Sequence, residues 1–333
     1  MKVKEVMTRA VATCQPFDKL LDAASIIQRE DVGCLPVVTD DGSDRVLGLL
    51  SDRDIAMAAG RERSSLAEMY VRNAMTGAVL SRAVNGPLEE ALAYMRSTGA
   101  RRLPVVDRDG RLLGLLSLSD ITLIAVSEKD ALAAARRAEI CRILAVSTRA
   151  RKRRGGLASS TAIVDELMAT DVVTCRSDET LGAVARRMDR TGVPCTPVLE
   201  AGGGRRVVAM LTDRDICMAA ASLARPLDEV TVALAMSPVL RSCWPDDSLD
   251  ATTAIMRAYG VRRLPVIDSS FELLGLIALG DLARSSLTND LPSEDIPACD
   301  EIAETLAAIV RLRGKQPARG RGRREDLPPH IER

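Results

Sequence analysis

A hydroxyl residue and a carboxylate three positions apart recur along the sequence, each time directly after a short apolar stretch. The intact pairs are Ser51 and Asp54, Ser117 and Asp120, and Thr212 and Asp215, whereas a fourth copy keeps Asp281 but has Ala278 instead of the hydroxyl residue. Such a pair can cap the N-terminus of a following helix. It can also bind a phosphorylated sugar, because a carboxylate accepts hydrogen bonds from a diol and a hydroxyl donates one to phosphate. Both interpretations remain open from the residue types alone.

Arginines near these pairs favour an anionic ligand. Arg53 and Arg214 lie within the first helical turn after two of the pairs. A cation there is unfavourable against the helix dipole, and an anion docked on the free N–H groups of that turn offsets this. Because the two regions repeat each other, the arginines can equally be one inherited feature. The second copy has Ser119 at this position, so Arg101-Arg102 and Arg262-Arg263 are alternative phosphate contacts, or else solvated residues before a strand.

The sequence repeats itself on two scales. A shift of 161 residues carries Pro36 to Pro197 and Asp54 to Asp215. Within the first half, a shift of 68 residues carries Pro36 to Pro104. The chain therefore consists of four units of roughly 55 to 60 residues, arranged as two consecutive pairs.

Each unit predicts the element order β-α-β-β-α. In the first unit we expect a strand at 11–14, an amphipathic helix at 16–28, a hairpin of strands at 35–38 and 46–50, and a helix from Ser51. One unit alone cannot bury two helices and a sheet, so we expect consecutive units to share one core. The predicted fold is α+β (α/β-type), with four such units paired into two tandem modules.

These features resemble the cystathionine-β-synthase (CBS) domain, and a pair of units resembles a Bateman module. The resemblance rests on the segment from Val3 to Thr8, the strand Leu35-Pro36-Val37-Val38, the strand end Gly48-Leu49-Leu50-Ser51 and the Ser51–Asp54 turn, with their repeats. It covers roughly residues 3–125 and 163–287. It implies a stand-alone protein with four CBS units.

The repeat and the resemblance together predict four regions along the chain. Residues 1–126 form the first pair, with unit 1 at 1–62 and unit 2 at 68–126, and residues 161–288 form the second pair, with unit 3 at 161–223 and unit 4 at 229–288. Residues 127–160 between the pairs are expected to be a helical and basic linker. Residues 289–333 are expected to be a C-terminal helix and a disordered basic tail.

The resemblance implies adenine-nucleotide sites at the recurring turns. In CBS modules the acid of the turn bonds the ribose hydroxyls, the hydroxyl residue faces the phosphate, and the adenine lies against the first strand and the segment before the second. Carried over, the ribose and phosphate contacts are Ser51, Arg53, Asp54, Arg102, Ser117, Asp120, Thr212, Arg214 and Asp215, and the base contacts are Thr13, Cys14, Gly33, Cys34, Thr174, Cys175 and Cys195. The fourth site is expected to be weak or empty. AMP, ADP or ATP is the expected ligand, S-adenosylmethionine is an alternative, and magnesium enters only as a nucleotide counter-ion.

Cysteine and histidine usage argues against catalysis. The only histidine is His330, no two of the eight cysteines form a C-x-x-C motif, and neither a phosphate loop nor a nucleophile–base pair is recognisable, so we expect no enzyme. Cys14 and Cys34 are spaced like Cys175 and Cys195. These four are either a redox switch, which needs adjacent thiols of depressed pKa, or small buried residues beside a ligand, which we favour.

The charge balance limits the partners. Lys plus Arg and Asp plus Glu both number 46, so the chain has no overall field that attracts nucleic acid or membranes. Basic runs at 149–154 and 319–324 could contact nucleic acid, but without interleaved aromatics a solvated linker and tail are favoured. With neither a signal peptide nor a long apolar segment, we expect a cytoplasmic protein that does not contact a membrane.

We therefore expect a regulatory sensor that binds an adenine nucleotide and changes conformation or association on binding. The protein effector is not identifiable, and the two modules can pair within one chain or through a homodimer. The alternative is a non-catalytic scaffold with vestigial pockets, for which Ala278 in the fourth turn argues.

Overall fold

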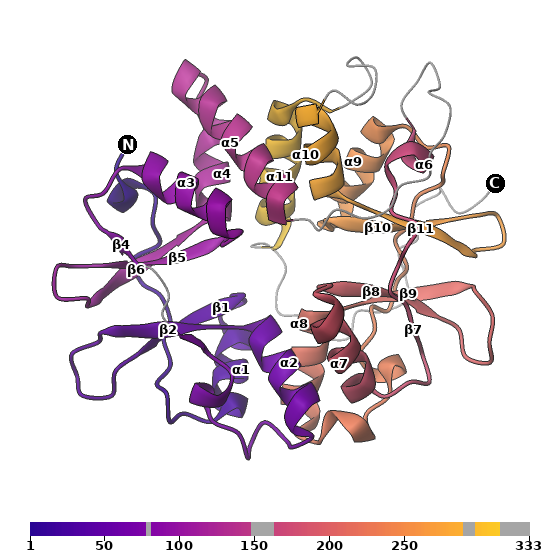
Figure 1. Cartoon of the computed structure of the whole chain (residues 1–333), viewed down its shortest axis with the longest axis horizontal. Helices are drawn as coiled ribbons and strands as arrows, with labels where there is room; N and C mark the ends of the chain where they lie inside the picture. Colours follow the sequence, from indigo (N-terminus) through magenta and orange to yellow (C-terminus); the bar gives the residue numbers. More distant parts are fainter. Residues whose placement is uncertain (78–80, 148–162, 289–296, 314–333) are drawn as a thin grey trace.

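The computed structural model describes residues 1–77, 81–147, 163–288 and 297–313. Within these ranges each quarter of the chain contains the expected hairpin flanked by helices (Figure 1). The basic runs at 149–154 and 319–324, and the tail predicted to be disordered, lie outside the described residues. None of the helices in the described ranges is both long and apolar enough to cross a membrane.

The first half contains units 1 and 2. Unit 1 consists of η1 (Val3–Glu5), α1 (Leu20–Arg29), β1 (Cys34–Val38), β2 (Val46–Ser51) and α2 (Asp52–Glu62). Unit 2 follows with η2 (Val71–Asn73), β3 (Thr76–Gly77), β4 (Arg82–Ala83), α3 (Leu88–Thr98), β5 (Arg102–Val106), β6 (Leu112–Ser117) and α4 (Leu118–Ser127). A further helix, α5 (Ala131–Ser147), ends the described part of this half.

The second half repeats this order. Unit 3 consists of α6 (Val164–Leu167), β7 (Cys175–Arg176), α7 (Leu181–Thr191), β8 (Cys195–Leu199), β9 (Val207–Thr212) and α8 (Asp213–Leu223). After η3 (Leu227–Glu229) and η4 (Val232–Leu234), unit 4 contains α9 (Leu249–Tyr259), β10 (Arg263–Ile267), β11 (Leu273–Ala278) and α10 (Leu279–Thr288). The helix α11 (Cys299–Arg313) closes the described chain.

The hairpin in each unit has one register. In unit 1, Cys34 pairs with Ser51 and Leu35 with Leu50 in antiparallel strands, and the other three hairpins are paired in the same way. The strand expected at 11–14 is reduced to a single parallel bridge between Cys14 and Val37. The first helix begins at Leu20 rather than at residue 16, because Asp18 accepts a hydrogen bond from the Gln15 N–H and closes a turn there.

Consecutive units are joined through their sheets. The N-terminal segment of unit 1 crosses β6 of unit 2, where Thr8 and Leu115 exchange two backbone hydrogen bonds of 2.9 Å. Gly114 permits this crossing, because a Cβ at that position would collide with the Thr8 carbonyl oxygen. Arg45 and Arg111 form a second bridge between the two hairpins.

The hydrophobic cores are shared differently from the sequence prediction. One cluster joins units 1 and 3, with Ile55 and Leu35 packed in the same core as Ile216 and Leu181. A second cluster joins units 2 and 4 and also buries the N-terminal segments of units 1 and 3, and a small third cluster joins unit 3 to unit 4. The expectation that consecutive units share one core is therefore confirmed only in part: most of each large core forms between the two halves, whereas consecutive units share the N-terminal segments and the small third cluster. Figure 1 shows the result: α1, α2, α7 and α8 lie along one side, the helices of units 2 and 4 lie along the opposite side together with α6, and the sheets lie between them.

The helices that follow units 2 and 4 belong to the second core. The helical part of the linker expected at 127–160 is α5, and it buries Ile140, Cys141 and Ile143 against units 2 and 4. Ile302 and Leu306 of α11 are buried in the same cluster. Both helices therefore contribute to holding unit 2 on unit 4, which a periodicity analysis of single units does not reveal.

Candidate functional site

The three intact hydroxyl–acid pairs all form capping boxes. Oδ2 of Asp54 accepts hydrogen bonds from the Ser51 backbone N–H (2.8 Å) and from Ser51 Oγ (2.5 Å), while Ser51 Oγ accepts one from the Asp54 N–H (3.3 Å). Ser117 with Asp120 and Thr212 with Asp215 repeat this arrangement. The capping interpretation therefore holds at all three turns.

This geometry also limits what the turns can offer a ligand. Because the hydroxyl of Ser51 donates to Asp54, it can donate to a phosphate only after its proton rotates away from the carboxylate. Among the described residues, the hydrogen bonds to Asp54 and Asp120 end on Oδ2, so Oδ1 of each half-buried carboxylate is the atom suited to accept from a ribose. Burial raises the pKa of Asp120, and the Ser117 hydrogen bonds and the Arg102 charge act in the opposite direction.

Arg102 connects the predicted base segment of unit 1 to the turn of unit 2. A Cβ added to Gly33 would lie 2.6 Å from Arg102 Nη2, so the guanidinium lies directly against the Gly33 backbone. The positive charge of Arg102 also acts on the neighbouring Cys34 and on Asp120, and the negative charge of Asp54 reaches Cys34 as well. The structure thus brings five predicted site residues together across units 1 and 2, and we call Gly33, Cys34, Asp54, Arg102 and Asp120 the inter-unit cluster.

Arg53 and Arg214 point away from their own turns. Arg53 Nη1 donates to the Val193 carbonyl oxygen at 2.9 Å, and Arg214 Nη1 donates to that of Val32 at 2.9 Å. Each arginine therefore reaches from one half of the chain to the backbone just before the predicted base segment of the other half. Their placement in a first helical turn has a structural reason that the duplicated sequence alone does not show.

Two aspartates that the sequence analysis missed complete this contact. Arg53 lies 3.7 Å from Asp213, and Arg214 lies 3.5 Å from Asp52. Burial and the nearby Asp52 charge raise the pKa of Asp213 to about 6, while Arg53 and Arg263 act to lower it. The available signal was the Asp-Arg-Asp sequence that stands at both 52–54 and 213–215.

Units 2 and 4 contribute cations to the same region. Burial, together with the charges of Arg263 and Arg102, lowers the pKa of Arg101 to about 10, and Asp213 opposes this shift. Arg101 Nη2 donates to Ser147 Oγ at 2.8 Å. Arg101 and Arg263 thus lie within electrostatic range of Asp213, which is itself within range of Asp52, so charged side chains from all four units lie near one another where the two halves face each other.

The remaining predicted base contacts are mostly buried. Cys14, Cys34, Cys175 and Cys195 are all buried, and burial raises the pKa of Cys14 and of Cys175 to about 12. A redox switch needs depressed thiol pKa values, so the structure favours the packing interpretation for these residues. The Thr174 carbonyl oxygen accepts a hydrogen bond from Arg187 Nη1 at 2.7 Å, which holds the segment before β7.

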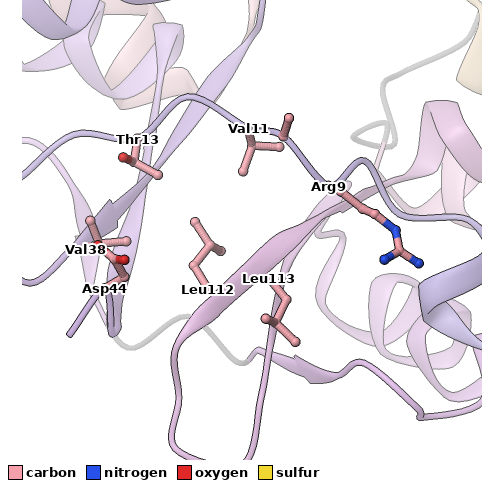
Figure 2. Close-up of a pocket in the computed structure, with 8 residues that line it drawn as sticks. Arg9, Val11, Thr13, Val38, Asp44, Leu112 and Leu113 are labelled. Atoms are coloured by element: carbon pink, nitrogen blue, oxygen red, sulfur yellow. The ribbon is translucent and has the colours of Figure 1, made fainter. Parts of the chain in front are cut away.

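Thr13 lies in a cavity of about 230 Å³ between units 1 and 2. Figure 2 shows Thr13 and Val38 to one side of this cavity and Leu112 and Leu113 of β6 to the other. The volume is below the roughly 300–1,000 Å³ of typical ligand pockets. The lining contains none of the capping boxes, so the structure does not join Thr13 to the inter-unit cluster in one cavity.

Unit 4 uses its carboxylate internally. Asp281 is 4% exposed, accepts a hydrogen bond from the Ala278 N–H at 2.9 Å, and lies 3.3 Å from Arg284. Arg284 also donates to the Ala145 carbonyl oxygen of α5 at 2.9 Å. Within the described part of the chain, no three His, Cys, Asp or Glu side chains are grouped as metal ligands.

Comparisons with known proteins place this geometry in context. The family model of the CBS domain matches residues 3–61, 83–127, 164–222 and 229–288, more than half of the chain. The CBS domain-containing protein YhcV of Bacillus subtilis (strain 168) is 36% identical over 132 residues, which cover 39% of this chain and 89% of that protein. The inosine-5'-monophosphate dehydrogenase of Methanocaldococcus jannaschii is 31% identical over 120 residues, but these cover only 23% of that enzyme.

A solved structure resembles nearly the whole chain. Protein MJ1225 from Methanocaldococcus jannaschii, a proposed archaeal homologue of g-AMPK, matches with a TM-score of 0.60 over 85% of this chain and 99% of that one. The two sequences are 19% identical, so this likeness shows a shared fold.

Proposed function

The chain belongs to the CBS domain family, and we propose that it is a regulatory protein that binds an adenine nucleotide between consecutive units. The observation that carries the proposal is the inter-unit cluster, where Arg102 of unit 2 lies against the Gly33 backbone of unit 1. Because both units contribute residues to this site, its geometry depends on how the two units are positioned relative to each other. Ligand binding at such a site biases the conformation only to the extent that it favours one arrangement of the units.

Each group of the cluster suits one part of a nucleotide. The Asp54 and Asp120 carboxylates can accept hydrogen bonds from ribose hydroxyls. The Arg102 guanidinium can bind phosphate oxygens through two parallel hydrogen bonds. The absence of a side chain on Gly33 leaves room beside the backbone, which the Arg102 guanidinium fills, and a planar base takes this place when the guanidinium turns toward the phosphate. AMP, ADP and ATP share these groups, and S-adenosylmethionine shares the adenine and the ribose.

Arg53 and Arg214 provide a route from the site to the other half. Val32, whose carbonyl oxygen accepts the hydrogen bond from Arg214, directly precedes Gly33. A ligand that moves the Gly33-Cys34 segment therefore acts on a contact with unit 3. We propose that occupancy is transmitted in this way to the packing of the two halves within one chain, and from there to a protein effector.

We further propose that the chain has no catalytic activity. The dehydrogenase relative supports this, because the similarity extends over only 23% of that enzyme. Neither nucleic acid nor a membrane is part of the proposed function. Magnesium is expected only as the counter-ion of a bound nucleotide.

The scaffold alternative is favoured by the capping boxes. Every intact hydroxyl–acid pair already fulfils a structural role as a helix cap, and Asp281 is ion-paired with Arg284. If these roles are sufficient to explain the motif, the four units form a rigid assembly that presents a surface to partners, and nucleotides do not bind.

Calorimetric titration separates the two functions. The purified full chain is titrated with AMP, ADP, ATP and S-adenosylmethionine, with and without magnesium, and then again as the Arg102→Ala variant. Arg108→Ala is the matched control, because Arg108 lies exposed in the turn of the same hairpin. Saturable binding that is weakened by Arg102→Ala but not by Arg108→Ala supports the nucleotide proposal. No saturable binding at millimolar concentrations, with a normal melting transition, establishes the scaffold.

A further inference from the structure

Two thiols lie close together where the helices α5, α10 and α11 pack against one another. Cys141, on the buried face of α5, donates a hydrogen bond to the Ala283 carbonyl oxygen of α10 at 3.5 Å. Cys299 is the first residue of α11, and its Sγ lies 3.5 Å from Ser286 Oγ. Ala283 and Ser286 are about one helical turn apart on α10, so both thiols contact the same stretch of this helix, and each thiol influences the pKa of the other. The two sulfurs are thus neighbours although the residues are 158 positions apart.

The two thiols differ in accessibility. Cys141 is fully buried, whereas Cys299 is the only one of the eight cysteines that is not buried. An oxidant from solvent therefore reaches Cys299 first, and Cys141 lies behind it as the second thiol. This arrangement of an accessible thiol with a neighbouring resolving thiol is typical of reversible cysteine oxidation.

The surroundings of Cys299 favour its thiolate. The neighbouring Cys141 thiol, the hydrogen bond with Ser286 and the charge of Arg142 lower the pKa of Cys299 to about 6, although burial and Asp300 act in the opposite direction. The N-terminus of α11 adds its free N–H groups to this stabilisation. By contrast, burial raises the pKa of Cys14 to about 12.

We propose that Cys299 is a site of oxidation by hydroperoxides and that Cys141 resolves it into a disulfide between α5 and α11. The Cys299 thiolate attacks the peroxide, so that an S–O bond forms, the O–O bond breaks, and the departing oxygen takes a proton to leave as water or an alcohol. Cys141 then attacks the sulfenic sulfur, so that the S–S bond forms and the S–O bond breaks. The hydroxide leaves as water with the proton of Cys141, and the two cysteines have together transferred two electrons to the peroxide.

The disulfide would connect helices that both belong to the core of units 2 and 4. Arg137 of α5 already forms an ion pair of 2.7 Å with Asp300 of α11, next to the thiols. A covalent bond at this point fixes the N-terminus of α11 on α5. It therefore stabilises the helical layer of units 2 and 4, which lies opposite the helical layer of units 1 and 3. Formation of this disulfide does not require nucleotide binding, so the absence of nucleotide binding would leave it unchanged.

Peroxide treatment of the full chain tests the proposal. The reduced protein is exposed to stoichiometric hydrogen peroxide and examined by intact-mass measurement and by peptide mapping without reductant. We expect a mass loss of two hydrogen atoms per chain and one peptide pair linked through Cys141 and Cys299. Addition of dithiothreitol should restore the original mass.

Variants assign the two roles. Cys141→Ser should leave Cys299 trapped as a sulfenic acid that dimedone labels, whereas Cys243→Ser, a matched change of another buried cysteine, should leave the disulfide unchanged. In the untreated protein at pH 7, iodoacetamide should label Cys299 at least about tenfold faster than any other cysteine. If Cys141→Ser does not fold, the peptide map of the unmodified sequence alone decides. Equal labelling of all cysteines, oxidation of another cysteine first, or a disulfide between two chains each overturns the proposal.

Discussion

Replacement of Asp213 by Asn should stabilise the folded protein at neutral pH, and this gain should disappear at acidic pH. The Asp213 carboxylate is buried beside Asp52, and its pKa is raised from 3.8 to about 6. The folded state therefore binds this proton more tightly than the unfolded state. It follows that the stability contributed by this group is fully present below about pH 4 and is lost as the pH rises through about 6.

The magnitude follows from the size of the shift. A difference of about two pH units corresponds to about 3 kcal/mol at 1.36 kcal/mol per unit. The attraction of Arg53 is already included, because it is one of the effects that lower this pKa. Asn cannot ionise but keeps an oxygen for the hydrogen bond from the Arg214 N–H, which Asp213 Oδ1 accepts at 3.0 Å. The variant should therefore match the native protein near pH 4 and exceed its stability by up to about 3 kcal/mol above pH 7.

Urea unfolding between pH 4 and pH 8 measures this effect. The difference between the native protein and Asp213→Asn cancels the contribution of all other titrating groups. Asp109→Asn, in an exposed hairpin turn, is the control and should show no such dependence. A difference between Asp213→Asn and the native protein that stays constant over this range would refute the reasoning, since it means that Asp213 ionises equally easily in both states.

Four further substitutions test the proposed site and the contact between the two halves. Asp54→Ala and Asp215→Ala should each weaken nucleotide binding about tenfold or more, because a hydrogen bond to a charged group contributes roughly 1.5–3 kcal/mol; unchanged affinity in calorimetry would leave both residues as helix caps. Arg102→Ala should weaken ATP binding most strongly at low salt, where charge attraction is least screened, and the same loss in Arg108→Ala would point to a general charge effect. Arg214→Ala should lower the free energy of unfolding by about 2 kcal/mol, because it removes a hydrogen bond to a backbone carbonyl of the other half and two ion pairs; urea unfolding at pH 7 checks this, and an unchanged midpoint contradicts it.

The repeating elements were predictable because each unit carries its own local signals. The Leu35-Pro36-Val37-Val38 strand, the turn rich in Asp and Gly, and the Ser51 cap determine a hairpin and a helix whatever the rest of the chain does. Four copies at regular spacing remove the ambiguity of a single short pattern. The capping boxes at Ser51, Ser117 and Thr212 follow from the same local signals.

The packing of the units was not predictable in this way. The amphipathic face of α2 shows that Ile55 is buried, but the pattern is the same whether its neighbour comes from unit 2 or from unit 3. The contacts of Arg53 and Arg214 with the other half were equally unpredictable. Nothing in the sequence around an arginine in a first helical turn indicates that it donates a hydrogen bond to a carbonyl some 140 to 180 residues away. Cys141 and Cys299 went unnoticed for the same reason, since only the folded chain brings them together.

Duplication explains why the four turns need not have one function. The carboxylate of the fourth turn, Asp281, is buried and bound to Arg284, which in turn bonds the α5 backbone. Its counterpart in unit 2, Asp120, has no such cation on its own helix and instead lies within reach of Arg102. One inherited motif therefore links α10 to α5 in unit 4, whereas in unit 2 it forms a capping box whose carboxylate we propose also binds the ligand. For this reason we expect fewer than four equivalents of nucleotide per chain, with units 1 and 2 contributing the strongest site.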